Sequence, residues 1–192
     1  RHPVSRKNSV SAQNRQKILL TLAPTRRNQQ FRAPKAANSR FFYDLLEREV
    51  LRLQRYGHPF TLVYMDIDNF KMINDRYGHD TGDIVLKAVA RTLTSLKRDD
   101  DLLVRWGGEE FLVAWPDTTL EAAIAVSERL RQAIAELEIE VNSTPIRVTF
   151  SAGLAELKSG ESLNETVKTA DKWLYAAKGS GRNRVCYQAD VF

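Results

Sequence analysis

The sequence predicts an α/β (α+β) domain in which helices flank a mostly antiparallel central sheet. Two observations support this fold class. Apolar residues recur at helical spacing in four long segments. Short apolar runs typical of strands lie between these segments, and two of the runs are joined through Gly107-Gly108, which is a hairpin signal. A hairpin among crossover helices implies antiparallel strand pairs with helices packed on the sheet.

The expected elements follow in the order helix, strand, helix, hairpin, helix, strand and helix. The first helix begins near Asn38, and Gly57 and Pro59 end it. The expected ranges after it are strand Phe60–Ile67, helix Thr81–Lys97, strands Leu102–Trp106 and Phe111–Trp115, helix Leu120–Leu137, strand Ile146–Ala155, helix Asn164–Lys178 and a closing strand at Arg184–Gln188. Ferredoxin-like and polymerase-palm domains have this arrangement. Because such folds host many functions, the site must decide the function.

The charge of the chain is unevenly distributed. Residues 1–40 hold ten Lys or Arg and no Asp or Glu, whereas the rest of the chain holds 19 basic and 24 acidic residues. We therefore expect residues 1–37 to form a basic linker or disordered extension, with a short helix near Ala12–Leu22, and residues 38–192 to form one domain. Binding of the extension to nucleic acid or anionic lipid is the alternative to a solvated linker. We expect no nucleic-acid partner, because the extension lacks basic residues interleaved with aromatic ones.

The single cysteine and the lack of a long apolar segment exclude several classes of protein. Cys186 is the single cysteine, so an internal disulfide and a cysteine metal cluster are excluded. A single cysteine fits a reducing compartment, and we expect a cytoplasmic location. No segment approaches the roughly 18 consecutive apolar residues of a membrane span. The chain begins with Arg rather than Met, so we expect a fragment of a longer protein.

Carboxylates gather at the ends of the predicted strands. Asp66 and Asp68 are two residues apart on a strand, so they share one face where extended geometry persists. Glu109 and Glu110 follow the two-glycine turn, which a neighbouring hairpin can bring to Asp66. Clustered carboxylates repel one another unless a cation lies among them, and oxygen ligands favour a hard ion such as Mg²⁺. The alternative is that these residues are ordinary acids of a turn.

Four motifs in succession resemble the diguanylate cyclase (GGDEF) family. Asp66–Asp83 is similar to its long first motif, and Arg105–Phe111 resembles its signature in the variant with Glu at the third position. Thr149–Ala155 resembles its later strand, and Asp171–Asn183 resembles its last helix and the following loop. The resemblance implies an enzyme, a nucleotidyltransferase, that condenses two GTP molecules into cyclic di-GMP and two pyrophosphates. A catalytically silent domain that binds GTP or cyclic di-GMP as a receptor is the alternative.

The resemblance also implies a metal and a catalytic centre. Asp66, the carbonyl of Ile67 and Glu109 would hold Mg²⁺, with Mn²⁺ as an alternative ion. Glu110 would help to hold the metal or assist deprotonation. Lys71, counted with Glu109 and Glu110 among the catalytic residues, would meet phosphate charge.

Other residues would bind the substrate. Gly107 and Gly108 lack side chains, so the backbone can approach a triphosphate closely. Lys178 and Arg182 would meet phosphate charge, although compensation of the helix dipole is the alternative. The residues that would contact the nucleoside are Asn74, Asp83 and His79.

These nucleoside-binding roles have alternatives. A carboxylate at Asp83 accepts from N1–H and the 2-amino group of guanine, which adenine lacks on that edge. The alternative for Asp83 is an acid placed favourably near a helix N-terminus. His79 could equally stabilise a turn.

A second site follows from a charged segment. Arg98 and Asp101 form an Arg-x-x-Asp pattern, and five residues separate Asp101 from Gly107. This spacing resembles the family's inhibitory product-binding site, and Arg129 matches the position of a secondary arginine there. Arginine forks can grip the guanine and phosphate of cyclic di-GMP. The alternative is a charged loop between a helix and a strand.

The assembly and the start of the domain follow from the same resemblance. One domain presents one GTP, so we expect a homodimer in which two domains face each other. We expect an upstream sensory domain outside this chain, with the chain as the cytoplasmic part of a membrane-anchored sensor as one arrangement. The family usually has Asp-x-Leu-Thr-Gly-Leu before the Asn-x-Arg-x-Phe segment that Asn38–Phe42 resembles. The segment Phe31–Ala36 stands in its place and does not match.

Overall fold

A computed structural model describes residues 37–188 of the chain, and the side chains of residues 42–188. Three expectations therefore lie outside the described residues: the basic extension, the short helix at 12–22 and the mismatched segment at 31–36. Within residues 37–188 no helix is both long and apolar enough to cross a bilayer.

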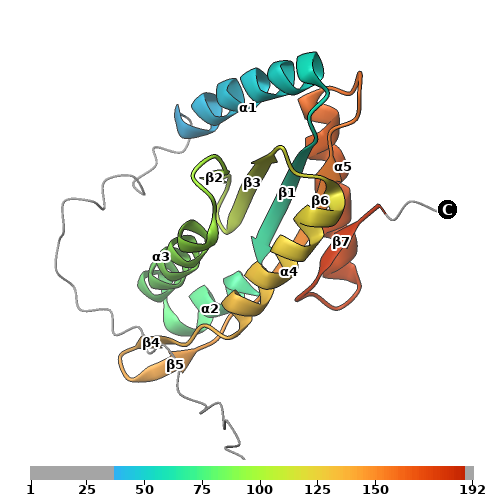
Figure 1. Cartoon of the computed structure of the whole chain (residues 1–192). Helices are drawn as coiled ribbons and strands as arrows, with labels where there is room; N and C mark the ends of the chain where they lie inside the picture. Colours follow the sequence, from blue (N-terminus) through green and yellow to red (C-terminus); the bar gives the residue numbers. More distant parts are fainter. Residues whose placement is uncertain (1–36, 189–192) are drawn as a thin grey trace, which may run out of the picture.

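A five-stranded sheet forms the centre of the domain in the order β2-β3-β1-β6-β7 (Figure 1). The strands are β1 (Phe60–Ile67), β2 (Leu102–Arg105), β3 (Glu110–Pro116), β6 (Phe150–Glu156) and β7 (Val185–Tyr187). All neighbours pair antiparallel except β6 and β7, which run parallel. The prediction of a mostly antiparallel sheet flanked by helices is confirmed.

Helices cover both faces of this sheet (Figure 1). On one face, α1 (Ala37–Tyr56) and α5 (Leu163–Gly179) pack on the even-numbered residues of β1, which include Leu62 and Tyr64. On the other, α3 (His79–Leu96) and α4 (Leu120–Ala135) pack on the odd-numbered residues, which include Val63 and Met65. Every residue of β1 is buried, as expected for a central strand with apolar layers on both sides.

Gly153 brings α5 close to the sheet. A Cβ on this β6 residue would lie within 2.7 Å of three backbone atoms of α5, from Ala170, Trp173 and Leu174, two of them far closer. Only a residue without a side chain therefore permits this approach. Since α5 carries Lys178 in its last turn, Gly153 also sets how near that lysine lies to the sheet.

Two elements were not predicted. The segment Phe70–Tyr77 forms the helix α2, which Gly78, with a φ of 85°, separates from α3. A separate two-stranded hairpin, β4 (Ile139–Val141) and β5 (Thr144–Ile146), takes the start of the expected strand 146–155. The Asn142-Ser143 turn between these strands has positive φ at both residues, as a two-residue hairpin turn requires. The other elements lie within two residues of the predicted ends, apart from Phe150, where β6 begins four residues late.

Candidate active site

Asp66 is the last residue but one of the strand β1. Its neighbours across the sheet are Glu110 on β3 and Ser151 on β6. As an even-numbered residue of β1 it faces α5, and its exposed fraction is only 7%. The backbone N–H of Ile67 donates to the carbonyl of Glu109 at 3.2 Å, which ties the hairpin turn to this end of β1. The structure thus brings the first carboxylate motif and the two-glycine turn side by side, as the sequence predicted.

Lys178 places a positive charge on the carboxylate of Asp66. The Nζ atom of Lys178 lies 2.9 Å from Oδ2 of Asp66. Burial raises the pKa of Asp66, the ion pair with Lys178 lowers it, and the charges of Glu109 and Glu110 raise it, so the pKa lies above its ordinary value. The ionised form of Asp66 therefore needs a cation beside it, and Lys178 supplies one.

The turn between β2 and β3 is held by its own backbone and by Arg105. The N–H of Trp106 donates to the carbonyl of Glu110 at 2.8 Å. The guanidinium of Arg105 donates to the carbonyls of Gly107 and Gly108, the shortest bond being 2.6 Å. With the carbonyls tied to Arg105, the turn has a defined shape beside Asp66.

Both glycines of this turn provide space. A Cβ on Gly107 would lie closer to Oε2 of Glu110 than van der Waals contact allows, so the missing side chain makes room for that carboxylate. Nothing lies within 4 Å of a Cβ on Gly108, which is exposed, so a ligand can approach its backbone. Gly107 therefore accommodates Glu110, and Gly108 is the more open of the two to a phosphate.

The sequence did not identify Tyr64 as part of this site. Tyr64 is buried on the same face of β1 as Asp66, two residues before it. Burial, followed by the charge of Glu110, raises the pKa of Tyr64 well above its ordinary value. The phenol is therefore neutral and lies near the Glu110 carboxylate. The strand sequence around Tyr64 is almost continuously apolar, so it did not indicate that Tyr64 lies beside a carboxylate of the site.

The carboxylates at this end of β1 suit a metal ion whose remaining ligands come from the substrate. Among residues 37–188 no three His, Cys, Asp or Glu side chains are close enough together to hold an ion by themselves. Mg²⁺ is typically bound through one or two carboxylates with phosphates and water as the other ligands. A buried carboxylate whose charge is unfavourable without a cation, with Glu109 and Glu110 adding negative charge, has the donor chemistry of such a site.

The residues expected to contact the nucleoside lie on α2 and α3. Asn74 packs on Gly82, since a Cβ on Gly82 would clash with the Oδ1 atom of Asn74. Asp83, the next residue, is exposed in the second turn of α3. Asn74 thus lies against the residue that precedes Asp83, a contact that no spacing in the sequence predicted. His79 is the first residue of α3 and is exposed.

Lys71 lies on α2, the helix that was not predicted. It is exposed and stands three residues before Asn74, so the two residues lie on neighbouring positions of one helix face. Arg182 lies in the segment between α5 and β7, with a φ of 63°. No ion pair with a described residue is found for Lys71 or Arg182 in the part of the chain from 42 to 188.

Asp68 was expected on the strand beside Asp66, but β1 ends at Ile67 and Asp68 lies in the turn that follows. Its carboxylate is already bonded within the protein. Oδ2 accepts from the Thr149 hydroxyl at 2.7 Å and from the Asn183 N–H at 3.0 Å, and Oδ1 accepts from the Ser151 hydroxyl at 2.7 Å. Its exposed fraction is 5%. The two aspartates are close in sequence, and their hydrogen-bond partners separate the available carboxylate of Asp66 from the saturated carboxylate of Asp68.

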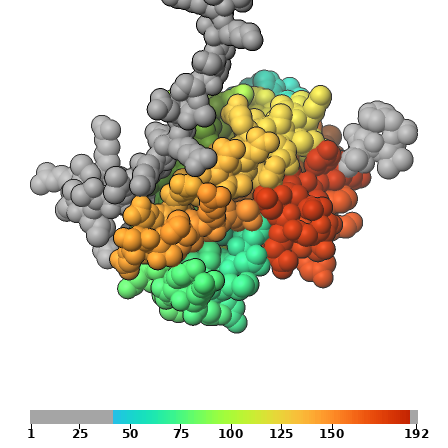
Figure 2. Space-filling model, turned by 90° about the horizontal axis from the view of Figure 1, so that it is seen from below, coloured from blue at the N-terminus to red at the C-terminus, as the bar shows by residue number. Residues whose placement is uncertain are grey.

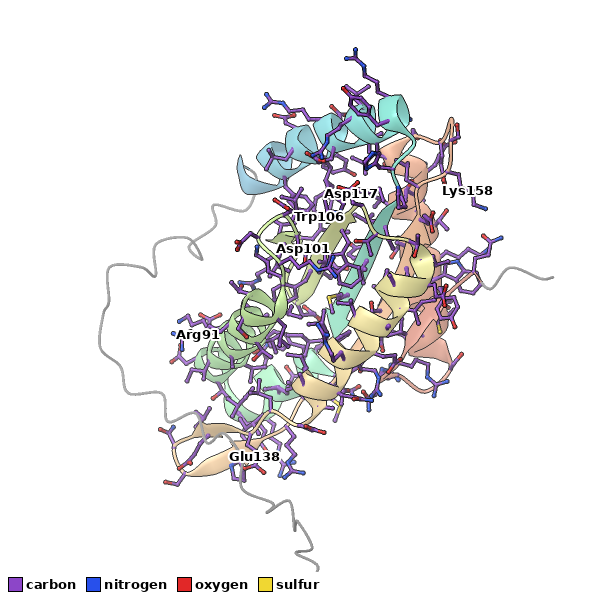
Figure 3. The ribbon with its side chains drawn as sticks, viewed as in Figure 1. Arg91, Asp101, Trp106, Asp117, Glu138 and Lys158 are labelled. Atoms are coloured by element: carbon purple, nitrogen blue, oxygen red, sulfur yellow. The ribbon has the colours of Figure 1, made fainter. Side chains whose placement is uncertain are left out.

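Arg98, Asp101 and Arg129 line one pocket of about 300 Å³ at the opposite end of β1 from Asp66. Asp101, labelled in Figure 3, is buried and accepts from the backbone N–H of Arg98 at 2.7 Å. Arg98 and Arg129 are exposed. The remaining lining residues include Trp115 and Asp117. The charged loop expected from the sequence therefore forms one wall of a cavity, and α4 supplies the other arginine.

A larger pocket of about 440 Å³ lies elsewhere and holds none of these residues. Glu156, Lys158 and Gln188 line it at the far end of β6. Two carboxylates line it, and both accept from backbone N–H groups: Glu156 from Leu120 at 2.7 Å and Glu161 from Lys158 at 3.1 Å. Size alone therefore does not mark the candidate site, and the chemistry lies at the other end of the sheet.

Known proteins are similar to this chain over most of the domain described above. The sequence model of the family "Diguanylate cyclase, GGDEF domain" matches residues 35–184. Diguanylate cyclase DgcM of Escherichia coli is 43% identical over 148 residues, which cover 77% of this chain and 35% of the relative. Diguanylate cyclase A of Treponema denticola is 41% identical over 149 residues, or 76% of this chain and 40% of the relative. The chain thus spans well under half the length of these relatives.

Solved structures show the same fold. The GGDEF domain of DgcB from Caulobacter crescentus, solved in complex with c-di-GMP, superposes with a TM-score of 0.73 at 35% identity. The match covers 76% of this chain and 87% of that chain. SiaD, a diguanylate cyclase from Pseudomonas aeruginosa solved with its activator SiaC, superposes with a TM-score of 0.75 at 42% identity, over 78% of this chain and 57% of that chain.

Proposed function

The chain belongs to the GGDEF diguanylate cyclase family, and from this membership we propose that it condenses two molecules of GTP into cyclic di-GMP. The observation that carries the proposal is the group formed by Asp66, the Gly107–Glu110 turn and Lys178 at one end of β1. This group offers carboxylates, an open glycine backbone and a cation within one small region. A nucleotide triphosphate needs all three.

The reaction is two successive nucleotidyl transfers. The 3′-oxygen of one GTP forms a bond to the α-phosphorus of the other, and the bond from that phosphorus to the β-phosphate oxygen breaks. Pyrophosphate leaves, and the proton of the hydroxyl is transferred to a base. Glu110 is the proposed acceptor, because Gly107 makes room for its carboxylate beside Asp66. A second transfer of the same kind closes the ring.

Diguanylate cyclases of this family generally use divalent metal ions. We propose that Asp66, the carbonyl of Ile67 and Glu109 hold one, with Glu110 beside them, and that the ion is Mg²⁺ or Mn²⁺. When bound, the ion would neutralise charge that develops on the phosphates. Lys178 is already a cation at Asp66, so it can move from that carboxylate to a phosphate oxygen when the metal arrives.

Recognition of the base is assigned to Asn74 on α2 and Asp83 on α3, since Asn74 packs on Gly82, the residue before Asp83. Asp83 can accept two hydrogen bonds from guanine, from N1–H and from the 2-amino group. Adenine cannot donate either one there, and would leave the carboxylate without partners. Lys71 and Arg182 are proposed for the phosphates, and His79 for the edge of the nucleotide.

Two chains must act together. Each domain provides one set of carboxylates and one guanine site, whereas the product contains two guanosines. We therefore propose a homodimer in which the two sites face each other. A sensory domain upstream in the longer protein would control how often they do so.

The pocket of Arg98, Asp101 and Arg129 supports product inhibition. Its arginines come from a loop and from α4, so they approach a ligand from two sides. A fork of donors from each can bind guanine and phosphate of cyclic di-GMP. The same pocket would serve a receptor that had lost catalysis, which is the alternative function.

One experiment decides between these functions. The purified chain is incubated with GTP and Mg²⁺, and cyclic di-GMP and pyrophosphate are measured by chromatography. Two pyrophosphates should appear for each cyclic di-GMP. Binding of cyclic di-GMP without any product from GTP would instead identify a receptor, and ATP in place of GTP should give no product.

A further inference from the structure

The segment between α5 and β7 has an unusual backbone. Gly181, Arg182 and Asn183 have successive φ values of 112°, 63° and 45°. Arginine rarely adopts this left-handed region, because its Cβ crowds the backbone. Such a run persists only where its surroundings hold it. Arg182, which the proposed function assigns to a phosphate, lies at the centre of the run.

Asp68 supplies one of the restraints. The N–H of Asn183 donates to its Oδ2 at 3.0 Å, and the carboxylate is buried with an exposed fraction of 5%. Thr149 and Ser151 fix the carboxylate itself through bonds of 2.7 Å. In addition, the N–H of Asp68 donates to the carbonyl of Thr149 at 2.9 Å, so the backbone of Asp68 is also held. The anchor for Asn183 is therefore rigid.

Arg131 supplies a second restraint from α4. Its Nη1 donates to Oδ1 of Asn183 at 2.9 Å, and Glu128 orients the guanidinium with a bond of 2.7 Å. Asn183 is thus held through its backbone by Asp68 and through its side chain by Arg131. Figure 2 shows the surface of the segment after β1 (teal to green) beside the C-terminal part of the chain (red).

We propose that Asp68 is a positioning residue for triphosphate binding, which acts through Asn183 to hold Arg182 beside Asp66. This inference rests on the proposed function. Asp68 is the first residue after β1 and lies two residues from Asp66, so the bond to Asn183 holds the Arg182 segment at the end of β1 that carries Asp66. The role differs from that of a metal ligand, because every bond that Asp68 accepts comes from an O–H or N–H of the protein.

A double-mutant cycle tests this role. Asp68→Asn keeps the size of the side chain but turns an amide group toward donors, and Arg182→Gln removes the charge that Asp68 is proposed to place. In the parent background Asp68→Asn should raise KM for GTP about tenfold while kcat stays within about threefold. In the Arg182→Gln background the same change should alter KM by less than about twofold, since two residues acting as a unit are not additive.

A second variant covers the case in which Asp68→Asn fails to fold. Arg131→Met removes the other restraint on Asn183 from the surface of α4. It should raise KM about threefold, and this effect too should vanish with Arg182→Gln. Asn183→Gly is the matched control for backbone strain. Glycine keeps the N–H for Asp68 and tolerates a φ of 45°, so KM should rise no more than in Arg131→Met.

The outcomes separate the two proposals. If the parent makes cyclic di-GMP and the effects of Asp68→Asn and Arg182→Gln on KM add, the positioning role is overturned and the proposed function stands. A fall in kcat with unchanged KM also overturns it. If the parent binds GTP in a calorimetric titration without turnover, the cycle is evaluated on Kd. A parent that neither turns over nor binds GTP overturns both.

Discussion

The Nζ atom of Lys178 lies 2.9 Å from Oδ2 of Asp66, so the last turn of α5 provides the cation nearest to the buried carboxylate of β1. Asp66 has an exposed fraction of 7%, and the side chain of Lys178 one of 34%. The lysine can therefore leave for a phosphate while remaining hydrated, whereas the aspartate cannot lose all its cationic partners without cost. This asymmetry determines what removal of Asp66 should do.

We predict that Asp66→Asn abolishes product formation without weakening the fold. A metal ligand is lost, and the lost stabilisation of the transition state corresponds to roughly 100-fold or more in turnover. The amide removes a buried charge that Glu109 and Glu110 repel, so the melting temperature should equal or exceed that of the parent. Product formation and thermal melting measure the two effects. Near-normal turnover in this variant would remove Asp66 from the metal site.

The stability of Asp66→Asn relative to the parent should depend on pH. Burial raises the pKa of Asp66 in the folded protein, so the folded state favours the protonated carboxyl. The resulting stabilisation is fully present below the unfolded pKa and is lost as pH rises through the folded pKa. The advantage of Asp66→Asn in melting temperature should therefore be largest near neutral pH and should shrink in acid. A constant difference between pH 4 and 7 would contradict the assignment.

We predict that two substitutions weaken GTP binding at the guanine site for different reasons. Asp83→Ala removes the acceptors, and should raise KM for GTP about 100-fold or more if both base contacts are lost. Gly82→Ala keeps Asp83 but adds a Cβ that clashes with Oδ1 of Asn74 and displaces that side chain, so it should weaken GTP binding while the helix remains stable. Binding of GTP and ATP is measured by titration, with circular dichroism as the control for folding. Parent-like GTP binding in Asp83→Ala would leave Asp83 as a helix-end acid.

The parts predicted from the sequence were those with a local signal. Phe60–Ile67 is a run of apolar residues that ends in acids, and the strand has those bounds. The glycine turn predicted the hairpin that lies beside Asp66. The resemblance to the family's inhibitory site, carried by the spacing of Arg98 and Asp101 from Gly107, brought Arg98 and Arg129 into one hypothesis, and the two line one pocket.

The missed parts depend on contacts between distant segments. Asp68 and Asn183 are 115 residues apart, and no spacing predicts their hydrogen bond. The helix α2 has only eight residues, and its partner in packing is α3, so its local pattern is too short to stand out. Tyr64 appeared as one more apolar residue of a buried strand, because its neighbour Glu110 comes from another part of the chain.

The packing of Tyr43 on Trp106 predicts a link between α1 and the glycine turn. The two rings lie 5.1 Å apart, and Trp106, labelled in Figure 3, directly precedes Gly107. Tyr43→Ala should lower the free energy of unfolding by about 1–2 kcal/mol and reduce kcat several-fold, since the turn that carries Glu109 loses its support. Tyr43→Phe keeps the ring and should behave as the parent. Unfolding in urea and steady-state kinetics measure the two quantities.

A destabilised control is needed for that comparison. Val50 is buried on the same helix, seven residues from Tyr43. Val50→Ala should cost a similar free energy of unfolding, about 1–2 kcal/mol, without the loss of kcat at a temperature well below melting. Equal losses of kcat in Tyr43→Ala and Val50→Ala would show that α1 acts only through stability.

The pocket at the other end of β2 predicts feedback by the product. The strand Leu102–Arg105 runs from Asp101 in the pocket to the glycine turn beside Asp66, so a ligand that stiffens one end of the hairpin can affect the other. Cyclic di-GMP can inhibit only if it binds the inactive arrangement more tightly than the active one, because equal binding shifts nothing. The ligand could also pin two domains apart through the same arginines.

Arg98→Ala separates feedback from catalysis. Arg98 is exposed, and its loss leaves Asp66, Asp83 and Glu109 in place, so the initial rate should stay within about twofold of the parent while slowing by accumulated product disappears. Progress curves with and without added cyclic di-GMP measure the slowing, and calorimetric titration measures binding of the product. Asp101 must be kept in this test, because its buried carboxylate accepts from the Arg98 backbone and shapes the loop. Unchanged inhibition in Arg98→Ala would place the feedback site elsewhere, and a parent that shows neither inhibition nor a second binding event would reduce the pocket to a solvated cavity.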